Sequence, residues 1–167
     1  LGPEAAATLE EGRKFAFERR GTSLDLHSPL RPALAWYTGQ PYATPGVREL
    51  LVAAINRGLH SLIISGGYGV LRAEEPIHSY GAHLPTQTRP VWARRVPVIL
   101  RDYVTCNGIR RAITVVSRGY ASVLPEALCE DDVRHVPTFS RGVDSGAALR
   151  VVPERIGALL AKVLADL

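Results

Sequence analysis

Two short apolar segments, residues 59–65 and 109–117, constrain the fold more than any other feature of the chain. Each has the length and apolar centre of a buried strand, and each ends in the same pattern of Ser, any residue, Gly and Tyr. Helical patterns with short connections separate them. Such alternation is typical of a parallel sheet covered by helices. We therefore predict a single α/β domain over residues 1–167, with a mostly parallel sheet flanked by helices.

Apolar periodicity predicts helices at residues 5–19, 47–55, 90–106, 120–129 and 153–167. The third of these carries a narrow apolar stripe that is expected to be buried, made of Trp92, Val96, Ile99 and Tyr103. Arg94 and Arg101 fall on its opposite face and are expected to be exposed. Pro97 predicts a kink or a late start in this helix. Short strands are expected at residues 133–139 and 149–152.

The composition excludes several classes of protein. Hydrophobic residues make up 46% of the chain and charged residues 22%, which argues against disorder along the whole length. No apolar run approaches the roughly 20 residues of a membrane span, so no membrane association is expected. Two cysteines, Cys106 and Cys129, are too few for a disulfide framework and favour a reduced, cytoplasmic protein. The chain has no methionine, even at position 1, so we expect the natural N-terminus to be missing.

The basic residues are almost all arginines. The net charge is +4, and only Lys14 and Lys162 are lysines. A GC-rich genome would produce this bias without any functional cause. Selection for bidentate phosphate contacts would produce it too, because arginine makes such contacts and lysine does not. In the second case the candidate phosphate ligands are Arg72, Arg89, Arg94, Arg95, Arg101 and Arg118.

The two Ser-X-Gly-Tyr loops form the first candidate ligand site. Their members are Ser65, Gly66, Gly67, Tyr68 and Gly69 in one loop, and Ser117, Arg118, Gly119 and Tyr120 in the other. We expect both loops at one rim of the sheet, where glycines admit a ligand to the backbone and tyrosines stack on a ring. Alternatively, the glycines only make tight turns and the tyrosines cover the sheet. Neither loop is a nucleotide-binding fingerprint.

Two further segments carry candidate site residues. Residues 71–80 contain Glu75 and His78, three positions apart, which as a carboxylate and an imidazole could share general acid–base chemistry. The alternative is a solvated loop without a role, and the spacing fits no common zinc pattern, so no metal is expected. Residues 36–42 contain three aromatics around a glycine, including Tyr37, and suit either base stacking or a small core under a loop.

Three pieces of sequence carry a family resemblance. Residues 32–42 contain a Tyr-Thr-Gly run, residues 63–72 contain a Ser-Gly-X-Tyr-Gly-X-Leu-Arg loop, and residues 77–80 follow in order. Together they resemble the peroxide stress protein family YaaA. The resemblance implies an α/β fold, a positively charged cleft, DNA binding and a role in limiting oxidative damage. It implies a site made of Ser65, Gly66, Tyr68, Gly69, Arg72, Glu75 and Tyr80.

Three functions remain open from the sequence. The first is binding of DNA, another nucleic acid or nucleotides in a basic cleft. The second is an enzyme acting on a nucleotide, nucleoside or related phosphate-bearing metabolite, of the glycosidase, transferase or lyase type, with Glu75, His78 and Tyr80 as catalytic groups. The third is a partner-binding domain without chemistry. No cofactor is expected. We expect Glu75 to be functional, either as an acid–base group or, if Arg72 pairs with it, as a group that orients a ligand.

Overall fold

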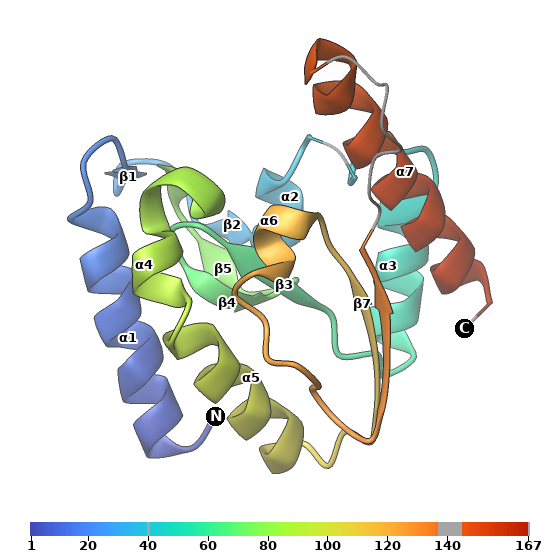
Figure 1. Ribbon diagram of the computed structural model, residues 1–167, viewed down its shortest axis with the longest axis horizontal. Coiled ribbons are helices and arrows are strands. Elements are labelled where there is room, and N and C mark those ends of the chain that lie inside the picture. The colour runs from blue at the N-terminus through green and yellow to red at the C-terminus, as the bar shows by residue number, and fades with distance from the viewer. Residues whose placement is uncertain (40, 137–144, 167) are drawn as a thin grey trace.

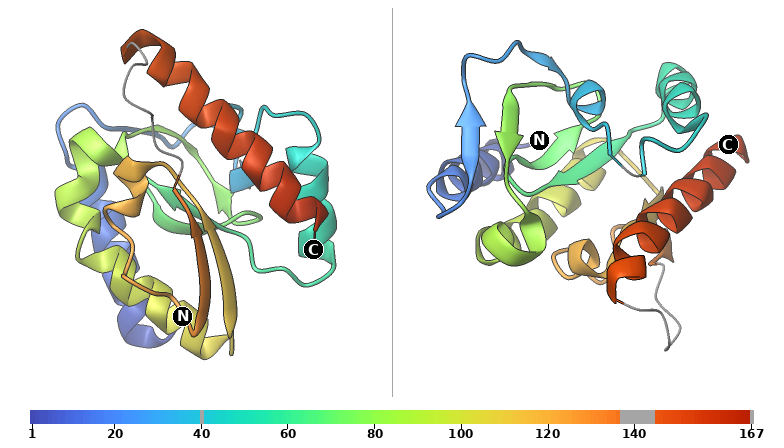
Figure 2. Two further views of the ribbon diagram at one scale, coloured as in Figure 1. Left: turned by 45° about the vertical axis from the view of Figure 1, so that its right-hand side comes forward. Right: turned by 90° about the horizontal axis from the view of Figure 1, so that it is seen from above.

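The structure is a computed structural model that describes residues 1–39, 41–136 and 145–166, with side chains from residue 155 onward in the last range. A central hairpin, β3–β4, lies between two groups of helices (Figure 1). On one side α1 (Pro3–Phe17) packs along α5 (Arg95–Cys106), and on the other α3 (Val47–Asn56) packs along α7 (Ser145–Ala165). Figure 2 shows α1 and α7 on opposite sides of the molecule.

The central hairpin forms because the first glycine-rich loop turns the chain back on itself. Strand β3 (Leu62–Ser65) pairs antiparallel with β4 (Gly69–Arg72), from Leu62 opposite Arg72 to Ser65 opposite Gly69. The Tyr68 N–H donates to Ser65 Oγ at 2.9 Å and closes the turn. Gly69 has a φ of +74°, in the left-handed region where glycine is favoured. The loop therefore leads into a second strand and not into a helix.

The prediction of a mostly parallel sheet flanked by helices is wrong. The described strands form two-stranded ladders, and three of these ladders are antiparallel. The first comprises β1 (Ser23–Asp25) and β6 (Ser79–Gly81), the second β2 (Arg31–Pro32) and β5 (Pro76–Ile77), and the third β3 and β4. Among the strands that the structure describes, only β7 (Arg111–Val115) and β8 (Asp131–His135) pair in parallel. Because β3 and β7 do not pair with each other, the two expected neighbours belong to separate ladders.

The apolar stripe before residue 106 is confirmed. Trp92, Val96 and Ile99 are fully buried and Tyr103 is 8% exposed, whereas Arg94 and Arg101 are exposed. The helix is interrupted: α4 (Arg89–Trp92) ends before α5 begins at Arg95. Pro97 thus lies in the first turn of α5, where a missing N–H costs no helical hydrogen bond. The helix expected at residues 90–106 is therefore present in two pieces, with the break just before Pro97.

Two other predicted elements are wrong. The helix expected at residues 120–129 is only the short α6 (Arg118–Ala121), because Pro125 disfavours helical geometry at the residue before it. The strand expected at residues 149–152 lies inside α7, which begins eight residues before Pro153. The strand expected at 133–139 is present as β8 up to His135, and residues 137–139 lie outside the described part. The remaining short elements are α2 (Ala33–Trp36) and the π-helix η1 (Leu84–Thr88).

Two hydrophobic clusters pack on opposite faces of the central hairpin. The cluster on the side of α1 and α5, called here the α5 cluster, includes Leu9, Val70, Leu84, Trp92, Val96, Ile99, Leu100 and Val123. The cluster on the side of α3 and α7, called the α3 cluster, includes Ala33, Leu34, Val47, Leu51, Ile63, Leu71, Ile77 and Leu164. Side chains alternate between the two faces along a strand, so Leu62 and Ile64 contact the first cluster while Ile63 belongs to the second. In the described ranges we find no helix that is both long and apolar enough to span a membrane.

Candidate functional site

Four of the other five tyrosines gather around Tyr80, which lies in β6. The rings of Tyr37 and Tyr68 pack edge-on to Tyr80, at centroid distances of 6.4 and 5.2 Å. Tyr42 packs against Tyr37 at 5.7 Å. Tyr120 follows β7 and lies close enough to Tyr80 for that residue to raise the pKa of Tyr120. These residues come from four separate parts of the chain, and we call them the tyrosine cluster.

A chain of hydroxyl groups runs through the tyrosine cluster. The Ser65 hydroxyl donates to Tyr80 Oη at 2.8 Å, and Tyr80 Oη lies 2.5 Å from Tyr37 Oη. Because Ser65 itself accepts from the Tyr68 N–H, its own hydrogen is directed toward Tyr80. When Tyr80 donates to Tyr37 in turn, the Tyr37 hydrogen is left to donate to another acceptor. Such chains strengthen each member by polarisation.

The cluster tyrosines stay protonated at neutral pH. Burial is the main reason that the pKa of Tyr37, Tyr42, Tyr80 and Tyr120 lies above the usual tyrosine value, since it disfavours the phenolate. The neighbouring Tyr80 hydroxyl raises the pKa of Tyr37 further, by the mutual repulsion of negative charges. These residues are therefore hydrogen-bond donors and poor general bases near pH 7.

The Ser65 loop is packed into the protein interior. A Cβ on Gly66 would fall 2.9 Å from Leu84 N, and a Cβ on Gly67 would fall 2.7 Å from ring atoms of Phe17 and Tyr80. The Gly66 carbonyl accepts a hydrogen bond from Trp92 Nε1 at 2.7 Å. The close contacts at Gly66 and Gly67 leave no space for a side chain, and the Trp92 hydrogen bond holds the turn against the α5 cluster. For Gly66, Gly67 and Gly69 the structure favours the packing alternative over a loop that encloses an anion.

The Ser117 loop approaches the same segment of the chain as the Ser65 loop. A Cβ on Gly119 would fall 2.8 Å from Pro85 Cγ, just beyond the residues that Gly66 contacts. The two loops thus both lie against residues 82–85. The expectation that they share the rim of one sheet is wrong, because β3 and β7 belong to different ladders. In contrast to Ser65, Ser117 and Tyr120 are partly exposed and Arg118 is exposed.

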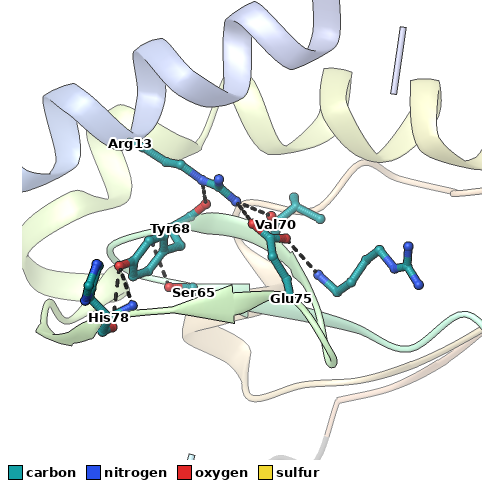
Figure 3. A network of polar contacts seen from close by, with 7 residues as sticks. Arg13, Ser65, Tyr68, Val70, Glu75 and His78 are labelled. Carbon is teal, nitrogen blue, oxygen red and sulfur yellow. Dashed lines mark hydrogen bonds and ion pairs between the residues drawn. The ribbon is translucent and has the colours of Figure 1, made fainter. Parts of the chain in front are cut away.

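Glu75 and His78 point to different partners (Figure 3). The Glu75 carboxylate accepts a hydrogen bond from Arg13 Nη2 at 2.7 Å and from the Arg72 backbone N–H at 3.3 Å. The Arg13 guanidinium also donates to the Tyr68 carbonyl at 3.1 Å. His78 Nδ1 lies 2.7 Å from the Ser28 carbonyl, on the other side of Tyr68. We find Glu75 linking the central hairpin to α1 and His78 linking β6 to the loop after β1.

The pairing of Arg72 with Glu75, which the sequence left open, does not form between the two side chains. The Arg72 side chain forms an exposed ion pair with Glu74, and only its backbone N–H reaches Glu75. The cation that pairs with Glu75 is Arg13, 62 positions away in the sequence. No local sequence pattern could have identified this partner. Arg13 also lies over the Tyr68 ring, 5.5 Å from its centroid, so it fixes the ring and the carboxylate together.

Glu75→Gln should lower stability and leave ligand binding unchanged. The substitution weakens a charge-assisted hydrogen bond at a partly exposed site, and we expect a loss of about 1 kcal/mol in urea unfolding. Glu74→Gln is the matched control, since its ion pair with Arg72 is exposed and should contribute less than about 0.5 kcal/mol. Unchanged stability of Glu75→Gln, together with lost binding, would instead support the functional role that we expected from the sequence.

A pocket of about 780 Å³ lies between β3 and β7, and one of its ends is lined by Tyr37, Tyr42, Ser117 and Tyr120. Its walls are otherwise mainly apolar. Of the residues that the sequence proposed, Tyr37, Ser117 and Tyr120 line this pocket. Ser65 and Tyr80 do not line the pocket; they are connected to Tyr37 by the chain of hydroxyl hydrogen bonds. In the described part of the chain, Glu75 and His78 do not line it. Tyr42 also lines the pocket; the sequence pattern indicated its segment, residues 36–42, but did not place Tyr42 in the site.

Exposed arginines surround η1, beside the tyrosine end of the pocket. Arg89 begins α4 and donates to Ser122 Oγ at 3.1 Å, next to α6, where Arg118 is exposed. Arg19 lies in the same region, because its Nε donates a hydrogen bond to the Gln87 carbonyl at 3.4 Å. Arg95, by contrast, is held in an ion pair with Glu11 at 2.8 Å. In the ranges that the structure covers, we find no group of three or more His, Cys, Asp or Glu side chains that could hold a metal.

Comparison with known proteins identifies no relative. No family model matches the chain, and no curated protein or solved structure matches it significantly.

Proposed function

We propose that the tyrosine end of the pocket binds a nucleotide, either free or as one unit of a nucleic acid strand. The observation that carries this proposal is the combination of three tyrosine rings and a chain of hydroxyl groups at one end of a large apolar pocket. The tyrosine end is one part of this pocket, whose whole volume is about 780 Å³. The remaining features supply separate contacts for the base and for the phosphate of a nucleotide.

The base would be held by stacking and by a hydrogen bond. Tyr37, Tyr42 and Tyr120 present ring surfaces, and stacking of a base on an aromatic ring contributes about 1–3 kcal/mol. The raised pKa of Tyr37 keeps its hydroxyl protonated, so it can donate to a carbonyl or ring nitrogen of the base. Ser117 offers a second hydroxyl at the same end. This arrangement recognises a flat ring that carries acceptors on its edge.

The phosphate would be held by the arginines around η1. Arg118 directly follows Ser117 and is exposed, and Arg89 lies beside the same short helix. Both suit bidentate contacts to phosphate oxygens. The resemblance to the YaaA family, whose members bind DNA, agrees with a ligand of this chemistry. We favour DNA or another nucleic acid strand as the partner, and a cytoplasmic location, which the two unpaired cysteines support.

The alternative of an enzyme with Glu75 and His78 as acid and base receives less support. Each group already has a partner elsewhere, and the ion pair with Arg13 keeps the Glu75 carboxylate toward α1. A general acid or base must reach the reacting atom within hydrogen-bond distance. Tyr80, the third proposed catalytic group, is also committed to Ser65 and Tyr37. We therefore propose a binding function, in which Tyr80 positions Tyr37.

Tyr37→Phe should weaken nucleotide binding about tenfold, since it removes only the donor and keeps the ring. The measurement is a calorimetric titration with thymidine 5′-monophosphate and adenosine 5′-monophosphate at fixed ionic strength. Tyr103→Phe is the matched control, because Tyr103 lies at the end of α5, outside the tyrosine cluster, and its hydroxyl bonds His60. Equal affinities for the wild type and Tyr37→Phe would remove Tyr37 from the site.

A further inference from the structure

The pocket between β3 and β7 is bordered by strand edges. Residues 58–64 and 109–117 line it without interruption. A cavity over the face of a strand contacts every second residue, because side chains alternate between the two faces. Lining by every residue in turn means that the cavity opens onto the edge of each strand, where backbone groups are presented.

On β3, the edge toward the pocket carries unpaired backbone groups. The Ala73 N–H donates to the Ser61 carbonyl at 3.0 Å, so Ser61 and the second residue after it, Ile63, direct their backbone toward β4. The N–H and C=O groups of Leu62 and Ile64 therefore point to the other edge. Among the described strands, none pairs with that edge.

On β7, the same argument identifies a second set of groups. The Val116 N–H donates to the His135 carbonyl at 3.2 Å, so Val116 and every second residue before it face β8. The backbone groups of Arg111, Ile113 and Val115 face the pocket. This edge, too, has no partner strand in the part of the chain that the structure describes.

The two edges run in the same direction. At their start, His60 Nδ1 lies 2.8 Å from Tyr103 Oη, and the Ile109 N–H donates to the Val104 carbonyl at 3.0 Å, so both strands begin beside the end of α5. At their end, both following loops reach residues 82–85. Two aligned edges thus present alternating donors and acceptors across one space.

The space is also apolar on both faces. One wall comes from the side of the α5 cluster, with Leu100, Val104, Leu124 and Leu128. The opposite wall comes from the side of α3 and α7, with Leu51, Ile156, Leu160 and Leu164. A strand covered on both faces is apolar at nearly every position, unlike a strand at a surface.

We propose that this space binds an extended apolar segment of a partner polypeptide as an inserted β-strand. The segment would be about five residues long, like β7, and without proline. Its backbone would bond Leu62 and Ile64 on one side and Arg111, Ile113 and Val115 on the other. Its side chains would enter the two hydrophobic clusters in turn. A compact small molecule would satisfy few of these backbone groups, which is why we favour a peptide.

This inference is independent of the proposed nucleotide site. An inserted strand that pairs with β3 and β7 ends level with Ser65 and Ser117, where the two strands end. Tyr120 follows Ser117 in the chain, and Tyr37 is joined to Ser65 through Tyr80, so the tyrosine end of the pocket adjoins the point where the inserted strand would end. The two proposals rest on different groups, backbone edges in one and tyrosine side chains in the other, so loss of one activity need not affect the other.

The test uses a blocked synthetic peptide with a core of alternating valine and isoleucine, flanked by glutamates for solubility. Residue-resolved amide hydrogen exchange is measured by NMR with and without the peptide. We expect exchange at Leu62, Ile64 and Ile113 to slow at least tenfold. The amides of Ile63 and Thr114 are internal controls, because they already face β4 and β8, and should change much less.

A peptide of the same sequence, N-methylated at every second residue, serves as the matched control. It keeps the side chains but cannot donate along one edge, so it should bind at least tenfold more weakly. Equal binding of the two peptides, or unchanged exchange at the pocket-facing amides under saturation, would overturn the proposal. Slow exchange at these amides without peptide, in a sample that is dimeric by light scattering, would also overturn it, because a second copy would then occupy the space.

Discussion

Above about pH 10, the free energy of unfolding should fall steeply with rising pH. The pKa of Tyr37, Tyr42, Tyr80 and Tyr120 is raised in the folded protein, mainly by burial, while the unfolded chain ionises at the ordinary tyrosine value near 10. Between these values the folded state holds protons that the unfolded state has lost. Stability is therefore complete below about pH 9 and is lost as the pH rises.

The expected size of this effect is large. Each tyrosine that stays protonated in the folded state lowers the free energy of unfolding by about 1.4 kcal/mol per pH unit above its unfolded pKa. Tyr37 and Tyr42, with the largest rises, together give about 2.7 kcal/mol per unit, and the other cluster tyrosines add to this.

Urea unfolding at several pH values from about 7 to about 11 measures this slope. Tyr37→Phe should reduce it by about 1.4 kcal/mol per pH unit, since one proton is removed from the balance. The near-ultraviolet absorbance of tyrosinate provides an independent check on the folded protein. Full ionisation near pH 10 without loss of structure would contradict the buried tyrosine cluster.

Trp92→Ala should destabilise the protein by about 3–5 kcal/mol, as is usual for loss of a buried aromatic side chain. Trp92 has no exposed surface, and its ring lies against Gly12 and Gly69, where a Cβ would fall 2.8 Å or less from it. Its Nε1–H satisfies the Gly66 carbonyl, which would remain buried without a partner. The substitution thus removes both packing of the α5 cluster and the support of the Ser65 turn.

The second tryptophan provides the matched comparison. Trp36 also donates from Nε1 to a carbonyl, that of Ile77 at 2.9 Å, but it is only partly buried. Trp36→Ala should cost clearly less than Trp92→Ala in urea unfolding. Trp92→Phe separates the two contributions, because it keeps most of the ring and removes the hydrogen bond. If the two alanine variants lost the same free energy of unfolding, Trp92 would not be a main contributor to the packing of the α5 cluster.

Local sequence patterns predicted helices better than sheets. The apolar stripe from Trp92 to Tyr103 depends on periodicity within one element, and it is confirmed. The sheet prediction failed because an apolar segment does not specify its partner or direction. The segment from Ser65 to Gly69 was predicted only to end a strand, whereas the left-handed Gly69 and the hydrogen bond to the Ser65 hydroxyl make it the turn of a hairpin.

In the candidate site, too, the sequence indicated individual residues but not their contacts with other elements. Ser65, Tyr37, Tyr80 and Tyr120 were named from the sequence, but their contacts join residues up to 43 positions apart along the hydroxyl chain. The sequence placed Glu75 beside His78 because they are neighbours in the chain. The Arg13–Glu75 ion pair spans two elements and depends on how α1 lies over the hairpin. Such pairings follow from tertiary packing and leave no local signal.

The most direct test of the proposed nucleotide site is the salt dependence of binding to a fluorescently labelled single-stranded oligothymidylate. If Arg118 contacts a phosphate, Arg118→Ala should reduce the slope of log affinity against log salt by about 0.7, the value expected for one phosphate contact to a single strand. Arg101→Ala, exposed on α5, should leave the slope unchanged. Tyr37→Phe should lower affinity about tenfold at every salt concentration without changing the slope. Wild-type binding that both Arg118→Ala and Tyr37→Phe leave unaltered, or no binding at low salt, would contradict a nucleotide site at the tyrosine end of the pocket.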